Sequence, residues 1–472
     1  MTNEGTPCVS VIGGGLAGCE CALQLADRGI PVTLYEMRPL AMTPVHRGGG
    51  LAELVCSNSL KSTKPDSAAG LLKHELTCMG SHLLACARAC DVPAGGALAV
   101  DRDAFSHAVE QAIAERPLIE VVRREVTEVP TDGPVVIAAG PMCSDALAQR
   151  VTALVGGEHL AFFDAAAPIV DAASLDHTTL FSQSRYEEGG AGDYLNAAMD
   201  KEQYDAFVEA LLGAERVIAR DFERRELFQA CQPLEEVART GHDALRFGAF
   251  KPVGITDPAT GRRPWAVVQL RAENRECTAY NLVGFQTNLT FPEQRRVFRM
   301  VPGLEQAEFF RYGVMHRNTF VDAPRTLDET FAVRGMRRVR LAGQITGTEG
   351  YVEAMASGLL AALNVAADLA GAPLEPLPAD TALGALVAYA TSPETSGYQP
   401  MHVNFGLMPA LETTRRMRKQ ERYQAYAARA HASLDAWLAR NACAAGITPV
   451  QVTGVPQGID SGETSAPDAT RA

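Results

Sequence analysis

The first forty residues combine two short apolar runs with one helical period. Residues 8–12 form an apolar run that stops at three glycines, as a buried parallel strand does. A helix is expected from about residue 16 to residue 28, where Gly29 ends it, and a second apolar run covers 32–35. This pattern predicts one βαβ unit.

The pattern changes several times along the rest of the chain. Residues 39–66 lack periodicity and predict a long polar loop, which in compact domains is usually functional or disordered. A helix is expected from Asp66 or Ser67 to about residue 89, and 135–139 is typical of a buried strand. Beyond about 165 the pattern indicates scattered short strands and a helix near 200–212, before a core strand at 340–343 and an amphipathic helix at 350–370.

Glycines at the first turn suggest a dinucleotide site. Gly13-x-Gly15-x-x-Gly18 lies between the first strand and helix, and Glu36 ends the next strand. The glycines permit a tight turn and close approach of a pyrophosphate, the helix start offers free N–H groups, and the carboxylate accepts from ribose hydroxyls. A glycine-rich structural turn is the alternative. The predicted cofactor-binding residues are Gly13, Gly14, Gly15, Leu16, Ala17, Gly18, Glu36, Gly140, Gly343 and Gln344.

FAD is the expected dinucleotide because a long insertion separates this unit from a late strand and helix that could close over a flavin. The predicted class is α/β, a Rossmann-like, glutathione-reductase-like FAD-binding domain with an inserted α+β domain and a helical C-terminal segment. The expected boundaries are 1–164 and 311–375 for the two parts of the FAD-binding domain, 165–310 for the insertion, 376–445 for the helical segment and 446–472 for a disordered tail.

Composition and net charge bear on the number of domains, the location of the protein and its partners. The chain has 472 residues, 47% hydrophobic and 21% charged, which predicts two or three domains with buried cores. No apolar run reaches the roughly 18 residues of a membrane span, and the start lacks the basic residues of a secretory signal, so a cytoplasmic location is expected. The net charge of −13 means that any nucleic-acid site is a local basic patch.

The eleven cysteines have irregular spacing and no zinc-ligand pattern, so no metal site is predicted. Most are expected to be reduced, buried small hydrophobes, among them Cys19, Cys21, Cys78, Cys86 and Cys90.

Two stretches are rich in arginine. Residues 295–340 hold ten arginines against five acids, and a second cluster lies at 415–422. Either stretch can meet phosphates, although a solvated face is the more common explanation of a charge run. His316 and Arg317 are candidates for a place nearer the active site, against the more common structural role of a lone histidine.

Five longer strings carry a resemblance. They begin at Leu54 (LVCSNSL), Cys231 (CQPLEE), Met315 (MHRNTF), Gly343 (GQITGTEGYVE) and Gln399 (QPMHVNFGL). With the N-terminal unit they resemble the TrmFO family, GidA-related flavoproteins, over about residues 7–440. The resemblance implies FAD- and folate-dependent C5-methylation of uridine 54 in the tRNA T-loop. Methylenetetrahydrofolate is the implied carbon donor, and NADH or NADPH the implied source of electrons for FAD.

The family's two functional cysteines match Cys56 and Cys231. A thiolate that adds to C6 of uracil makes C5 nucleophilic, and Cys231 is the predicted nucleophile. Pro233 suits the first turn of a helix running to Gly241, whose start would lower the thiol pKa of Cys231. An inert buried cysteine is the usual alternative. Cys56 lies in the polar loop, where its role stays open between a general base at C5 and a partner of the flavin or its one-carbon adduct.

Three other functions remain to be distinguished. The related tRNA wobble-uridine flavoenzyme also uses folate but is longer, with a C-terminal partner-binding region that is not found here. A flavin oxidoreductase acting on a small molecule is the second alternative. A non-enzymatic FAD protein is the third, and it would have no need of two positioned thiols.

Overall fold

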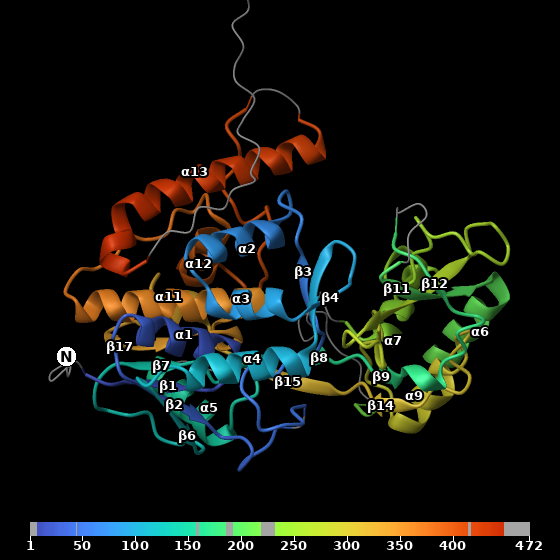
Figure 1. Ribbon diagram of the computed structural model, residues 1–472, viewed down its shortest axis with the longest axis horizontal. Coiled ribbons are helices and arrows are strands. Elements are labelled where there is room, and N and C mark those ends of the chain that lie inside the picture. Colours follow the sequence, from blue (N-terminus) through green and yellow to red (C-terminus); the bar gives the residue numbers. More distant parts are fainter. Residues whose placement is uncertain are drawn as a thin grey trace, which may run out of the picture.

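The computed structural model describes residues 7–43, 45–156, 160–185, 192–218, 232–413 and 417–447. One sheet forms the base of the larger part of the molecule (Figure 1). Five of its strands are parallel, and β16 adds an antiparallel edge. In spatial order the strands are β16 (Ala332–Val333), β17 (Met336–Leu341), β7 (Val135–Ile137), β1 (Val9–Ile12), β2 (Val32–Glu36) and β6 (Ile119–Arg123).

Helices cover both faces of this sheet. On one face α1 (Leu16–Asp27) lies against α11 (Tyr351–Leu369), and α5 (Asp145–Val155) lies below the sheet in Figure 1. A Cβ atom on Gly358 would lie 2.1 Å from the carbonyl oxygen of Ala17, so glycine is required for the close approach of α1 and α11. This is the predicted α/β arrangement, with the returning strand and helix beside the N-terminal unit.

A second sheet belongs to the smaller part of the molecule. It is antiparallel throughout, in the order β10 (Phe181–Ser182), β11 (Tyr194–Met199), β12 (Ala266–Ala272), β13 (Ala279–Leu282), β9 (Ile169–Asp171) and β14 (Phe309–Arg311). Its own core includes four clustered phenylalanine rings. The helices on it are α6 (Lys201–Leu212), α7 (Leu234–Arg239), α8 (Ala244–Phe247) and α9 (Phe291–Phe298). The paired strands β8 (Leu160–Ala165) and β15 (Met315–Phe320) run between the two parts.

The remaining elements lie on the larger part. A small sheet has the order β3 (Ser59–Ser62), β5 (Ala97–Val100) and β4 (Asp91–Val92), followed along the chain by α4 (Arg102–Ala114). In Figure 1, α3 (His82–Ala89) lies level with α11, and above them are α2 (Ala68–Cys78), α12 (Ala382–Thr391) and the long α13 (Lys419–Ala445). Short helices are η1 (Ala172–Ser174), α10 (Ala323–Thr326) and η4 (Gln344–Thr346).

Several local expectations were wrong. The stretch 39–66 is not all loop, because it contains β3. The helix expected from 66 to 89 is two helices, separated where Gly80 takes a φ of +76° and Ser81 caps α3. Ser67 does cap α2, accepting from the N–H of Gly70. Residues 376–443 form α12 and α13 with a non-helical segment in the described residues between them, and 448–472 lie outside the described residues.

The expectation about the cysteines also needs correction. Of the ten cysteines in the described residues, four are buried, so burial is not the rule, and Cys86 is only half-buried. Among the described residues, α11 is long and apolar enough to span a membrane by length and composition, but Glu353, Asn364 and Asp368 interrupt it. Because 89% of its most apolar window is buried inside the protein, its composition is that of a core helix.

Candidate functional site

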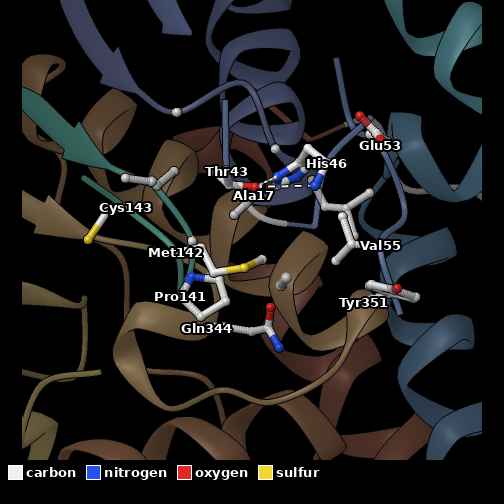
Figure 2. Close-up of a pocket in the computed structure, with 18 of the residues that line it drawn as sticks. Ala17, Thr43, His46, Glu53, Val55, Pro141, Met142, Cys143, Gln344 and Tyr351 are labelled. Atoms are coloured by element: carbon white, nitrogen blue, oxygen red, sulfur yellow. Dashed lines mark hydrogen bonds between the residues drawn. The ribbon is translucent and has the colours of Figure 1, made fainter. Parts of the chain in front are cut away.

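A pocket of about 300 Å³ opens at the carboxyl ends of the parallel strands. Eight of the ten predicted cofactor-binding residues line it, and Gly14 and Gly18 do not. Figure 2 shows Thr43 and His46 on one side of the pocket, facing Pro141 and Gln344 on the other. In open α/β sheets, ligands bind at this edge.

The three glycines of the turn have different structural roles. Gly13 has a φ of +111° and touches β7, where a Cβ atom would lie 2.4 Å from the Ala138 oxygen. Gly18 allows α1 to pack on the turn, since its Cβ would lie 1.8 Å from the Gly13 oxygen. Gly15 differs, because a Cβ there would meet no protein atom within 4 Å and would point into open space. Gly15 also begins α1 without any side-chain cap, which leaves N–H groups for a phosphate.

Glu36 reaches this turn from the end of β2. One carboxylate oxygen accepts from the Gly14 N–H at 2.9 Å, and the other accepts from the backbone and side chain of Arg38. Burial opposes ionisation, but the hydrogen bonds from Arg38 hold the pKa of Glu36 below its usual value. Glu36 is therefore a fixed anion, and ribose hydroxyls would share it with Arg38. The open space at Gly15, the uncapped helix and this carboxylate fit the FAD that the sequence predicts.

The Cys56 loop forms the opposite wall of the pocket. The N–H groups of Cys56 and Ser57 both donate to the phenol oxygen of Tyr351, at 2.8 and 3.2 Å. Tyr351 is the first residue of α11, and burial raises its pKa, so the phenol stays neutral. The Cys56 thiol is half-buried and donates to the Ala165 oxygen at 3.7 Å. Cys56 is thus held on the pocket wall with part of its surface open.

Arginines from distant parts of the chain hold the same loop. Arg271 on β12 donates to Ser57 Oγ and to Asn58 Oδ1, both at 2.7 Å. Arg102 donates to the carbonyl oxygen of Leu54 and is paired with Glu273. These contacts give the LVCSNSL string a physical meaning: the polar residues after Cys56 attach the loop to the second sheet.

Arg311 adds a buried cation close enough to be affected by the charge of Cys56. Burial, together with the charges of Arg102 and Arg47, lowers the pKa of Arg311 to about 10. Its Nη2 atom has no hydrogen-bond partner within the part of the chain that the structure describes. A buried donor without a partner is costly, so an acceptor that reached this atom would stabilise it.

Two further pocket residues were missed by the sequence analysis. Cys143 follows β7 and lines the pocket, where burial raises its thiol pKa to about 11, so it is mostly protonated near neutral pH. Asn318 on β15 also lines the pocket, and both polar atoms of its buried side chain lack partners among the described residues. Its place in the MHRNTF string was the available signal. A ligand in the pocket would satisfy this amide.

Three other predicted residues fall where the structure gives no description of their side chains. Cys231 and the side chains of His316 and Arg317 lie outside the described residues. The helix expected near Cys231 is the short α7, which begins after Pro233 and carries two acids in its first turn. A six-residue helix with these acids gives little support to a lowered thiol pKa. The role of Cys231 stays a prediction from the resemblance.

The arginines of 295–340 do not form one surface. Arg295 and Arg296 lie on α9 in the smaller part, while Arg337 and Arg340 lie on β17 at the far side of the larger sheet (Figure 1). Arg340 is buried, and Arg337 and Arg340 both pair with Asp368. The excess of positive charge in the sequence is therefore dispersed in space.

Comparison with known proteins decides the family. The family model described as glucose inhibited division protein A matches residues 8–373. The methylenetetrahydrofolate–tRNA-(uracil-5-)-methyltransferase TrmFO of Geobacter sulfurreducens is 56% identical over 92% of this chain and 99% of that relative. This chain belongs to the TrmFO family. The TrmFO protein of Pelobacter propionicus is 53% identical over 96% of this chain and 98% of its own length, so the predicted resemblance is confirmed.

Solved structures show the fold. The structure of Aquifex aeolicus GidA in its form II crystal has a TM-score of 0.67 at 15% sequence identity, over 93% of this chain and 74% of that chain. This similarity confirms the predicted fold class. In this TrmFO-family chain, three of the five strings that carried the resemblance meet at one pocket, through Cys56, Asn318 and the segment 343–353.

Proposed function

We propose that the protein transfers a one-carbon unit from methylenetetrahydrofolate to C5 of uridine 54 in the T-loop of tRNA and gives 5-methyluridine. Membership of the TrmFO family supports the reaction type, FAD and folate. The observation that carries the proposal is the position of Cys56, a half-open thiol on the wall of the pocket that the glycine turn also lines. An NAD(P)H requirement, a cytoplasmic location and independence of membranes stay predictions.

Different residues of the pocket would bind different groups of FAD. Gly15 and the start of α1 would hold the pyrophosphate, Glu36 would accept from the ribose, and Gly343 and Gln344 with the start of α11 are left to contact the flavin. Bound FAD, once reduced, supplies the electrons that convert a methylene group into a methyl group.

The chain's own thiols carry the remaining chemistry. In the proposal the Cys231 thiolate adds to C6 of the uracil, and the electron-rich C5 then attacks the one-carbon unit. Release of the C5 proton and departure of the Cys231 sulfur restore the C5–C6 double bond. The bond between the transferred carbon and the folate nitrogen breaks, tetrahydrofolate leaves, and two electrons from the reductant complete the methyl group. Cys56 either takes the C5 proton or holds the one-carbon unit. Its fixed backbone suits both tasks, because Tyr351 keeps the thiol at one place on the wall.

The test is a reconstituted reaction. Purified protein, unmodified tRNA, methylenetetrahydrofolate, FAD and NADH or NADPH are incubated, and the nucleosides are analysed by mass spectrometry. We expect 5-methyluridine in the T-loop, and its loss with Cys231→Ala. Cys443→Ala, at an exposed cysteine on α13, is the matched control and should keep full activity. A product at the wobble position, a requirement for S-adenosylmethionine, or full activity of Cys231→Ala would contradict the proposal.

A further inference from the structure

A second cavity lies between the start of α2 and the start of α13. Its volume is about 560 Å³, and its lining comes from the turn before α2, the 403–405 segment and the first turn of α13. Figure 1 shows α2 beside β3 and α13 above α2. We call this cavity the α2–α13 groove.

The groove is basic on an acidic protein. Lys64 and Lys419 line it, Arg422 is adjacent on α13, and all three side chains are exposed. None of the three forms an ion pair with any residue in the described ranges, although Asp66 is an acidic member of the lining. With a net charge of −13 for the whole chain, this local positive charge requires a reason. Unpaired exposed cations along a groove are typical of contacts to a phosphate backbone.

An aromatic platform lies beside these cations. Phe405 packs on Tyr423 with ring centroids 4.6 Å apart, and it stacks on Tyr426 at 5.3 Å. Tyr423 lines the groove, with Lys419 Nζ 5.5 Å and Arg422 Cζ 5.8 Å from its ring centroid. Cations that track a backbone and an aromatic ring that takes a base are the two features by which proteins hold unpaired nucleotides.

The groove lies near the Cys56 pocket. Lys61 lines the pocket, and Lys64 lines the groove three residues later, so their Cα atoms are at most about 10 Å apart. The buried carboxylate of Glu353 joins the two, because it accepts from Lys61 Nζ at 3.1 Å and from the Val403 N–H at 3.2 Å. An RNA with one base in the pocket therefore has its neighbouring nucleotides within reach of the groove.

We propose that the α2–α13 groove binds the phosphodiester backbone of the tRNA beside the target uridine, with one unstacked base on Tyr423. The proposal rests on the proposed function for the identity of the RNA. It assigns Lys64 and Lys419 to phosphates and Tyr423 to a base.

Binding of unmodified tRNA to the full-length protein tests this directly. Kd is measured by fluorescence anisotropy over a series of salt concentrations for the wild type and for Lys64→Gln/Lys419→Gln. We expect the double variant to bind about tenfold more weakly and to lower the slope of log Kd against log salt by about 2, one for each phosphate contact. Tyr423→Ala should weaken binding about tenfold or more with little change in slope, and Tyr423→Phe should restore it.

The controls separate this proposal from the methylation proposal. Arg150→Gln/Arg440→Gln removes two exposed charges away from the groove, on α5 and at the far end of α13, and should leave binding unchanged. In the groove variants, methylation at saturating tRNA should keep its kcat while KM for tRNA rises. A methylating wild type whose groove variants bind tRNA like the control would overturn the groove proposal and leave the methylation proposal standing. Absence of methylation by the wild type would instead count against the proposed function.

Discussion

Gly15→Ala separates cofactor binding from folding. Gly15 has φ of −80° and ψ of −170°, which alanine adopts without strain, and its Cβ would meet no protein atom within 4 Å. The apoprotein should keep its stability, or gain about 0.4–1 kcal/mol because the unfolded chain loses freedom. The added methyl group would occupy space assigned to the pyrophosphate. Overpacking of this kind costs about 1–3 kcal/mol, so FAD should bind about 5- to 150-fold more weakly.

Gly18→Ala is the matched control. The same methyl group at residue 18 would lie 1.8 Å from the Gly13 oxygen, so α1 would have to move away from the turn. We expect this variant to lose stability and FAD together. The assays are thermal unfolding of the apoprotein and titration with FAD followed by flavin fluorescence. If Gly15→Ala destabilised the apoprotein as much as Gly18→Ala, or bound FAD like the wild type, the assignment of the space at Gly15 would be wrong.

Two further predictions concern the fixed polar groups. Tyr351→Phe leaves the N–H groups of Cys56 and Ser57 without their acceptor, so it should lower the free energy of unfolding by about 1–3 kcal/mol, measured by thermal unfolding. We also expect a lower kcat with FAD binding retained. An unchanged kcat would argue against a role of Tyr351 in placing Cys56. Glu75 accepts from the first N–H groups of α12, and burial raises its pKa from 4.5 to about 7. The folded state therefore binds the extra proton between pH 4.5 and 7, and stability should fall by about 3 kcal/mol as pH rises through that window. Glu75→Gln should lack this fall in unfolding curves measured against pH, and an equal fall in both proteins would exclude Glu75 as its source.

The N-terminal unit could be predicted because its signals are local. Three glycines, one apolar period and Glu36 lie within thirty residues, and each acts on a neighbour in the chain. The break at Gly80 was missed because the apolar pattern runs through it, although Gly80 and the helix-capping Ser81 together mark the end of α2 and the start of α3. The strand β3 was missed because its sequence is polar and its pairing partner is almost forty residues away.

The surroundings of Cys56 could not be found from sequence pattern alone. The resemblance identified the thiol. The residues that position its loop, Tyr351 and Arg271, lie 295 and more than 200 residues away along the chain. The count of arginines over 295–340 did not predict one surface, since α9 and β17 lie in different parts of the molecule. Local composition does not predict which distant segments of the chain come together in space.

The hydrogen bonds of Asn58 restrict rotation of the two parts of the molecule relative to each other. Its side-chain amide donates to the carbonyl oxygen of Val100 in the larger part and to that of Ala272 at the end of β12, at 3.1 and 3.0 Å. A rotation of one part against the other must strain or break this bridge, two residues from Cys56. A macromolecule that binds both parts at once would therefore change the position of the Cys56 sulfur. Binding of the correct RNA and placement of this thiol for reaction would then be coupled.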